Sequence, residues 1–120
     1  MKFDMDLARK ILFAVEDYAE PNGYADINIE GYTNKEISYH IKLLSQANLI
    51  EAFDMTDSTG FDWKAKSLTW EGHQFLDSAR NTTHWTEAKK KILEKGGSLT
   101  FEMIKVTLSE ILKNLILPTP

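Results

Sequence analysis

Hydrophobic and polar positions in the first third of the chain change from a helical period to a strand period. Leu7, Ile11, Ala14 and Tyr18 recur at spacings of four, three and four residues, which predicts a helix with one buried stripe. The tripeptide PNG then ends the helix. Residues 25–31, ADINIEG, alternate apolar and polar side chains and predict a short strand with one solvated face.

The most clearly marked start of a helix in the sequence lies at Thr33. Thr33 and Glu36 have the spacing of a capping box, in which each side chain bonds to the backbone N–H of the other residue. Asn48 is suited to the left-handed conformation that closes a helix. The pattern therefore predicts a helix over residues 34–47, with Ile37, Ile41 and Leu44 on its buried face.

A hairpin and three further helices follow. Two strand-like runs, residues 49–55 and 61–68, flank the turn-rich TDSTG and predict a β-hairpin. Thr69 is the expected cap of the next helix, and Ser98 that of the last. The last helix carries a short heptad-like apolar seam: Phe101, Ile104, Leu108, Ile111 and Leu115.

The order helix, short strand, helix, hairpin predicts an α+β fold of the winged-helix type, followed by C-terminal helices. The first helix of the usual helix-turn-helix is shortened to the turn EGY or is missing. We expect residues 1–80 to form the winged-helix core. Residues 81–120 are expected to be a helical extension that packs on this core, giving a single domain overall.

Composition narrows the classes of function. The 120 residues contain no cysteine, which excludes disulfides and thiolate metal sites. The formal net charge of −4 weakens broad electrostatic binding to nucleic acid without excluding a local basic face. No signal-peptide pattern and no apolar run of membrane-spanning length is recognisable, so the sequence predicts a cytoplasmic protein without membrane contact.

Four runs of residues resemble a known family: DMDLARKIL, IEGYTNKEISYHIKLL, GFDWKAKSLTWEGHQFLDSAR and KGGSLTFEMIK. Together, and in this order, they resemble the bacterial and phage proteins of domain of unknown function family 2513. The later part, LTWEGHQFL through WTEAKKKI, is also similar to the YjcQ family of small winged-helix proteins. The resemblance implies a winged-helix fold and an origin in a bacterium or one of its phages. It implies no established activity and no catalytic residues.

The outward face of the helix over residues 34–47 is a candidate binding surface for duplex DNA. Lysine suits phosphate or guanine, amide side chains suit adenine, and serine suits several bases. The alternative is that this is an ordinary solvated helix face, which carries the same residue types. The candidate residues are Asn34, Lys35, Ser38, Tyr39, Lys42 and Gln46.

The predicted hairpin is more acidic than a DNA-contacting wing should be. Its carboxylates outnumber its lysines by four to two, and they would be repelled by a phosphate backbone. If DNA is the target, Lys64 and Lys66 at the base of the wing are the expected phosphate contacts. The four carboxylates are Glu51, Asp54, Asp57 and Asp62.

The same hairpin offers a second interpretation, contact with a protein. Strand alternation must turn some of its large apolar side chains outward. Trp63 is a candidate contact for a partner protein, although half-buried packing is the more frequent situation for such a tryptophan. The apolar side chains concerned are Phe53, Met55, Phe61 and Trp63.

The last helix suggests a homodimer. Leu108, Ile111 and Leu115 are the candidate contacts, since the seam runs into an apolar terminus, ILKNLILPTP, that a small domain has difficulty covering alone. The alternative, a core helix that packs on the first helix, is equally compatible with the pattern.

Enzymatic signatures are missing from the sequence. His40, His73 and His84 are scattered without metal-ligand spacing, and His40 is expected to be a packed, hydrogen-bonded side chain. No catalytic residue, metal or cofactor is predicted. The sequence therefore predicts a non-enzymatic winged-helix binding protein, with a DNA-binding transcriptional regulator as the first interpretation. The alternative is an adaptor, or a phage-encoded modulator of a host protein, that does not bind DNA.

Overall fold

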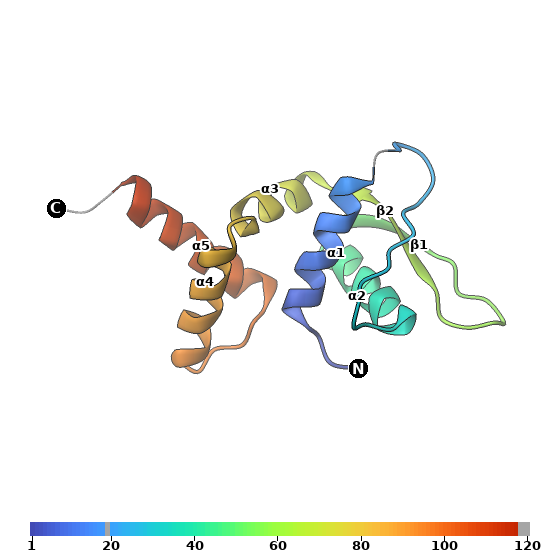
Figure 1. Cartoon of the computed structure of the whole chain (residues 1–120), viewed down its shortest axis with the longest axis horizontal. Helices are drawn as coiled ribbons and strands as arrows, with labels where there is room; N and C mark the ends of the chain where they lie inside the picture. The colour runs from blue at the N-terminus through green and yellow to red at the C-terminus, as the bar shows by residue number, and fades with distance from the viewer. Residues whose placement is uncertain (19, 118–120) are drawn as a thin grey trace. The chain divides into compact units, whose positions relative to one another are not determined.

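The structure, a computed structural model, describes residues 1–18 and 20–117 and divides into two compact units, Met1–Gln74 and Phe75–Pro120 (Figure 1). The α+β class is confirmed: two helices precede a two-stranded antiparallel hairpin, and three helices follow. The elements in order are α1 (Met5–Asp17), α2 (Asn34–Gln46), β1 (Ile50–Asp54), β2 (Trp63–Leu68), α3 (Trp70–Ala79), α4 (Thr82–Glu94) and α5 (Phe101–Ile116).

Local capping chemistry sets both ends of α2 as predicted. The Thr33 hydroxyl accepts from the Glu36 N–H at 3.1 Å, while the Glu36 carboxylate accepts from the Thr33 N–H at 3.0 Å. At the other end Asn48 has a φ of 62°, and the Leu49 N–H donates to the Leu44 carbonyl. This is a Schellman closure, which turns the chain toward β1.

The N-terminus of α1 is tied to α2 through Asp4. Its Oδ1 caps α1 by accepting from the Asp6 and Leu7 N–H groups, and its Oδ2 accepts from the Tyr32 hydroxyl at 3.1 Å. Burial, followed by this hydrogen bond to Asp4, raises the pKa of Tyr32. The Asp4 N–H donates to Nε2 of His40 at 2.8 Å, so one residue connects α1, the turn before α2 and α2 itself.

The core of the first unit lies where α1 and α2 contact the hairpin. The buried face of α1 includes Leu7 and Ile11 as predicted, but Ala14 and Tyr18 are only half-buried. The predicted stripe was too narrow, because α1 contacts both α2 and β2 and therefore buries two adjacent rows of side chains. The buried residues of α1 are Met5, Leu7, Ala8, Ile11, Leu12 and Val15.

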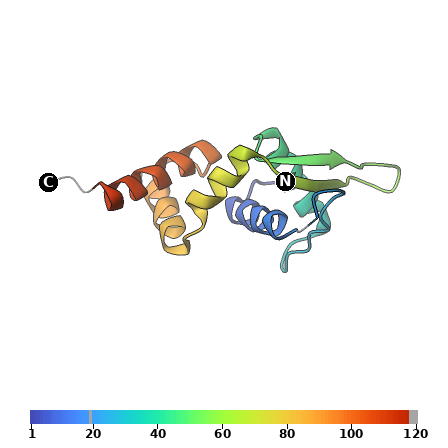
Figure 2. The same cartoon turned by 90° about the horizontal axis from the view of Figure 1, so that it is seen from above.

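The hairpin pairs β1 with β2 from Ile50↔Leu68 to Asp54↔Trp63, with an irregularity between Glu51 and Ala52. Figure 2 shows the two strands side by side and continuing into the loop that joins them. The loop closes through a pair of backbone hydrogen bonds between Asp57 and Gly60.

The strand predicted over residues 25–31 is wrong. Only Ala25 pairs with the hairpin, by an N–H that donates to the Ala65 carbonyl at 2.8 Å. Ile27 is 9% exposed and is held by packing instead. The ladder does not continue past Ala25, because the backbone N–H and carbonyl of Trp63 lie at hydrogen-bonding distance from the Ser38 hydroxyl. The alternation of apolar and polar residues in this segment could not predict that the Ser38 hydroxyl would engage these backbone groups.

Thr69 caps α3, as predicted, by accepting from the Gly72 N–H at 3.0 Å. In the second unit α4 and α5 lie side by side (Figure 1), and the ring of Phe75 meets those of Trp85 and Phe101 edge-on. The predicted cap of α5 is wrong by two residues. Thr100, not Ser98, accepts from the Met103 N–H and starts the helix.

The apolar seam of α5 is shorter than predicted. Ile104, Leu108 and Ile111 are buried, but Leu115 is 62% exposed. Among the residues that the structure describes, no helix combines the length and apolar character that crossing a membrane requires.

Candidate interaction surface on α2 and the hairpin

The outward face of α2 is continuous with the hairpin. Asn34, Lys35 and Gln46 are exposed, whereas Tyr39 and Lys42 are half-buried. The Lys42 ammonium lies 5.8 Å from the centre of the Phe61 ring, which belongs to the segment leading into β2. We call the outward side chains of α2, together with residues 51–64, the helix–hairpin surface.

Ser38 is not part of that surface. It is 6% exposed, and its hydroxyl lies 3.4 Å from the carbonyl oxygen and 3.2 Å from the backbone nitrogen of Trp63. Its prediction as a DNA contact placed it on the wrong side of the helix, because β2 covers the flank of α2 on which Ser38 lies. Ser38 therefore anchors α2 to β2, and its hydroxyl is engaged by the Trp63 backbone.

Replacing Ser38 with alanine is expected to lower the free energy of unfolding by about 1–2 kcal/mol, because the Trp63 backbone loses its side-chain partner. Urea denaturation followed by circular dichroism measures this loss. Ser45→Ala, on the same helix and half-buried, is the matched control and should change the free energy by less than about 0.5 kcal/mol. Equal effects of the two variants would show that the Ser38 bonds contribute nothing.

The two hairpin lysines that were predicted as phosphate contacts are engaged with carboxylates. Lys64 lies 3.0 Å from Asp26 and 3.7 Å from Asp62, and its hydrogen bond to Asp26 raises its pKa. Lys66 lies 3.8 Å from Glu51. A phosphate group would have to compete with these carboxylates for either lysine.

Two carboxylates in the hairpin loop are held by the loop itself. Asp54 accepts from the Thr56 N–H at 3.0 Å, and Asp57 accepts from the Thr59 N–H at 2.8 Å. Hydrogen bonds from the threonine side chains, and then from their backbone N–H groups, lower the pKa of Asp54 and of Asp57. Both are therefore ionised at neutral pH, and within residues 1–18 and 20–117 neither forms an ion pair, although the charge of Lys42 also acts on Asp54.

Apolar side chains are exposed between these charges. Phe53 and Met55 are each 40% exposed and Phe61 is 36% exposed, which confirms that part of the apolar hairpin side chains face outward. Trp63 is half-buried.

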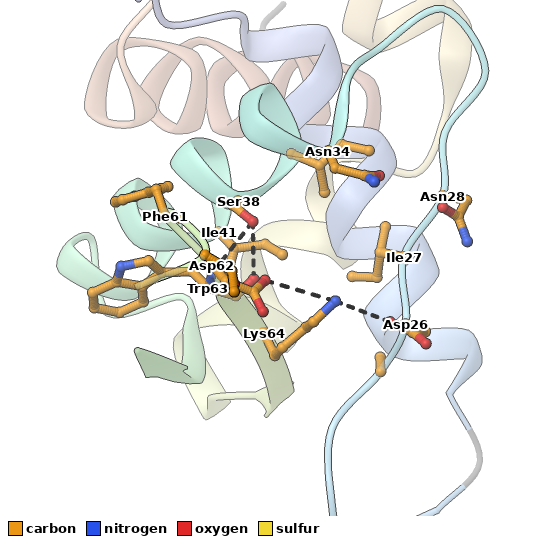
Figure 3. Close-up of a pocket in the computed structure, with 14 residues that line it drawn as sticks. Asp26, Ile27, Asn28, Asn34, Ser38, Ile41, Phe61, Asp62, Trp63 and Lys64 are labelled. Atoms are coloured by element: carbon orange, nitrogen blue, oxygen red, sulfur yellow. Dashed lines mark hydrogen bonds and ion pairs between the residues drawn. The ribbon is translucent and has the colours of Figure 1, made fainter. Parts of the chain in front are cut away.

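A hollow of about 410 Å³ lies between residues 25–28, the start of α2 and the hairpin (Figure 3). The close-up places Asp26, Lys64 and Asp62 in one row along it, joined by the ion pairs described above. Asn34 and Phe61 also contribute to the lining of the hollow. The hollow therefore combines charged, amide and aromatic side chains.

Comparison with known proteins places the chain in a family. Residues 2–98 match the family described as "Hypothetical protein (DUF2513)". The chain belongs to this family. The DUF2513 chain is also 36% identical, over 117 residues, to an uncharacterized protein of Haemophilus influenzae, an alignment that covers 97% of the chain and 99% of that relative. No solved structure matches it significantly. The resemblance to family 2513 is thus confirmed, whereas the winged-helix assignment and the similarity to YjcQ stay predictions.

One exposed side chain of the DUF2513 protein was missed by sequence reasoning. Trp70, the first residue of α3, is 71% exposed, the largest fraction among the three tryptophans. Its position directly after the cap Thr69 could have predicted this exposure, since the first turn of a helix contributes little to the buried stripe. Exposed tryptophans are frequent anchors of protein contacts.

The candidate dimer contacts Leu108 and Ile111 are 0% and 5% exposed. Because both are buried, neither is exposed to another copy. Leu115, Ile116 and Leu117 are exposed, and a homodimer through the end of α5 stays a prediction that rests on them. The boundary between the two compact units falls after Gln74. The packing of residues 81–120 on residues 1–80 stays a prediction.

His40 confirms its predicted role as a packed histidine. It is 1% exposed, its Nε2 accepts from the Asp4 N–H, and its Nδ1 lies 2.8 Å from the Glu36 carbonyl oxygen. Because Nε2 is an acceptor, the ring proton belongs on Nδ1. Across residues 1–18 and 20–117, no cluster of three or more histidine or carboxylate side chains is arranged to hold a metal ion.

Proposed function

We propose that the chain is a non-enzymatic binding protein whose first unit is a winged helix and whose helix–hairpin surface contacts another protein. One observation carries the proposal. The surface joins three exposed apolar side chains to carboxylates that retain their charge, while the hairpin lysines are paired internally. Exposed apolar area contributes affinity to a protein contact, and a rim of charge contributes specificity.

Charge supports a protein target over nucleic acid. Residues 1–74 contain seven lysines and arginines against thirteen aspartates and glutamates, a formal charge of −6. Binding to duplex DNA depends on neutralising phosphates with cations, so this unit would approach DNA against repulsion.

Capture from a lysate tests the protein-binding function. The immobilised chain is expected to retain a defined set of Haemophilus influenzae proteins, since the 36% identical relative comes from that bacterium. The double variant Phe53→Ser plus Phe61→Ser should lose those proteins, because it removes two apolar contacts while leaving every charge in place. Quantitative mass spectrometry of the retained proteins measures the loss.

The control is Leu93→Ser, which alters a 57% exposed apolar side chain of α4, outside the helix–hairpin surface. It should retain the same proteins as the native chain. Equal retention by the native chain and the hairpin double variant would reject this surface as the binding site. Circular dichroism of each variant ensures that an unfolded chain is not mistaken for a lost contact.

Duplex DNA is the second candidate, because Asn34, Lys35 and Gln46 are exposed along α2 and present DNA-compatible side chains. This candidate would be favoured if duplex DNA retained the native chain in a salt-sensitive manner and did not retain the double variant Lys35→Glu plus Lys42→Glu. No retention at low salt, or equal retention by this double variant, would remove DNA as the target of α2.

A further inference from the structure

We propose that the protein partner presents a segment rich in lysine or arginine, with apolar residues between the cations, to the helix–hairpin surface. This inference rests on the proposed function, because it names the chemistry of the partner that the surface would bind. It commits to a basic polypeptide and not to a nucleic acid or a second copy of the chain.

The overall charge of the first unit favours a basic partner. A formal charge of −6 on residues 1–74 attracts cations over the distance at which exposed charges are felt, about 8–10 Å at physiological salt. Such attraction raises the rate of encounter with a basic segment and lowers it for an acidic segment.

The hairpin loop supplies preorganised acceptors for that segment. Asp54 and Asp57 each use Oδ1 to accept from a threonine two residues later, which fixes the carboxylate relative to the loop. An ionised carboxylate accepts through both oxygens, so Oδ2 remains for an ammonium or guanidinium group. Because the turn already orders each aspartate, binding costs less side-chain entropy than it would for a free aspartate.

The hollow beside the loop supplies a second acidic position. Asp26 and Asp62 share one lysine, Lys64, so one negative charge of the three groups is not compensated. The Asp26 side chain is 79% exposed and can accept from a second cation without breaking its bond to Lys64. Figure 3 shows Asp26 and Asp62 on either side of the Lys64 ammonium.

Aromatic rings complete the match to a basic segment. The rings of Phe53 and Phe61 already lie 5.8 Å from the ammonium groups of Lys66 and Lys42. Ring faces attract cations, and the stems of lysine and arginine side chains cover apolar surface. Met55 adds a flexible apolar contact that adapts to different neighbours. An acidic or purely apolar segment would bring no cation to Asp54 and Asp57.

Three synthetic peptides with identical apolar residues test the inference against the full chain. Their polar positions carry arginine and lysine, glutamine, or glutamate, and calorimetry at low and at physiological salt measures their affinities. The basic peptide is expected to bind at least about tenfold more tightly than the neutral peptide and to weaken with salt, while the acidic peptide does not bind.

Matched charge variants locate the contact. Asp54→Asn plus Asp57→Asn should weaken binding of the basic peptide by about fivefold or more. Asp17→Asn plus Glu20→Gln makes the same change in net charge at exposed positions outside the hairpin and should weaken it less than about twofold. Amide NMR shifts induced by the basic peptide should concentrate in residues 51–64.

Equal binding of the basic and neutral peptides, no binding of any peptide at low salt, or equal losses in the two charge variants would overturn the inference. Tighter binding of duplex DNA than of the basic peptide would overturn it as well. The lysate capture separates this failure from failure of the proposed function. Partners that depend on Phe53 and Phe61 would still establish a protein-binding surface, with a partner of different chemistry.

Discussion

Replacing Gly72 with alanine is expected to lower the free energy of unfolding of the first unit by at least about 3 kcal/mol. A Cβ at this position would lie 1.9 Å from the carbonyl oxygen of Leu49 and 3.0 Å from its carbonyl carbon. Both obstructing atoms are backbone, and they sit between the closing turn of α2 and β1, so no side-chain rotation relieves the overlap. The start of α3 must instead move away.

Such a movement breaks further bonds. The Thr69 N–H donates to the same Leu49 carbonyl at 3.0 Å, and the Thr69 hydroxyl donates to the Asn48 carbonyl at 2.7 Å. Thermal denaturation followed by circular dichroism should show a fall of roughly 12 °C or more. Gln74→Ala, an exposed position on the same helix, is the control and should change the midpoint by only a few degrees. A Gly72→Ala chain as stable as the control would contradict the close approach of α3 to Leu49.

Replacing His40 with alanine is expected to cost about 3 kcal/mol in the free energy of unfolding. The change empties a fully buried site and removes the acceptor of the Asp4 N–H. It also removes the ring on which Phe3 stacks at 5.6 Å. Because Asp4 caps α1, the N-terminal turn of that helix should loosen first. Hydrogen exchange should therefore quicken at the Asp6 and Leu7 amides more than at the middle of α2.

Two further variants separate packing from hydrogen bonding. His40→Leu keeps much of the side-chain volume and should cost less than the alanine variant, although it leaves the Asp4 N–H unpaired. His73→Ala removes an exposed histidine and should cost less than about 0.5 kcal/mol. If His40→Ala were as mild as His73→Ala, the connection from α1 to α2 through Asp4 would not stabilise the fold.

Features set by neighbouring residues could be predicted from the sequence. The capping box of Thr33 and Glu36 and the left-handed Asn48 both form within a few residues, so the type and spacing of those residues determine them. The hairpin was predicted for the same reason, since a turn-rich loop joins two strand-like runs.

Features that depend on residues far apart in the chain could not be predicted from the sequence. Ser38 is buried because β2 packs on its side of α2, and the contact joins residues 25 positions apart. Lys64 is paired with Asp26, which lies 38 positions away, so the local sequence pattern could not show that this lysine is already engaged. Leu115 continues a heptad-like seam in the sequence yet is exposed, because periodicity says which residues share a face and not how far the neighbouring helix extends.

The candidate surface was predicted in composition but not in detail. The excess of carboxylates over lysines in the hairpin was plain in the sequence, and so was its supply of large apolar side chains. Which of them face outward, and which lysines are neutralised, depends on the register of β1 against β2 and on the path of residues 25–28.

The hydroxyl of Ser38 also hinders pairing of another strand with β2 at Trp63. The outer edge of a strand presents N–H and carbonyl groups that can pair with a strand from another molecule, and this is a common route to aggregation. At Trp63 those groups are engaged by Ser38, and at Ala65 the carbonyl is engaged by Ala25. We therefore expect partners to approach this edge through side chains and not by extending the sheet.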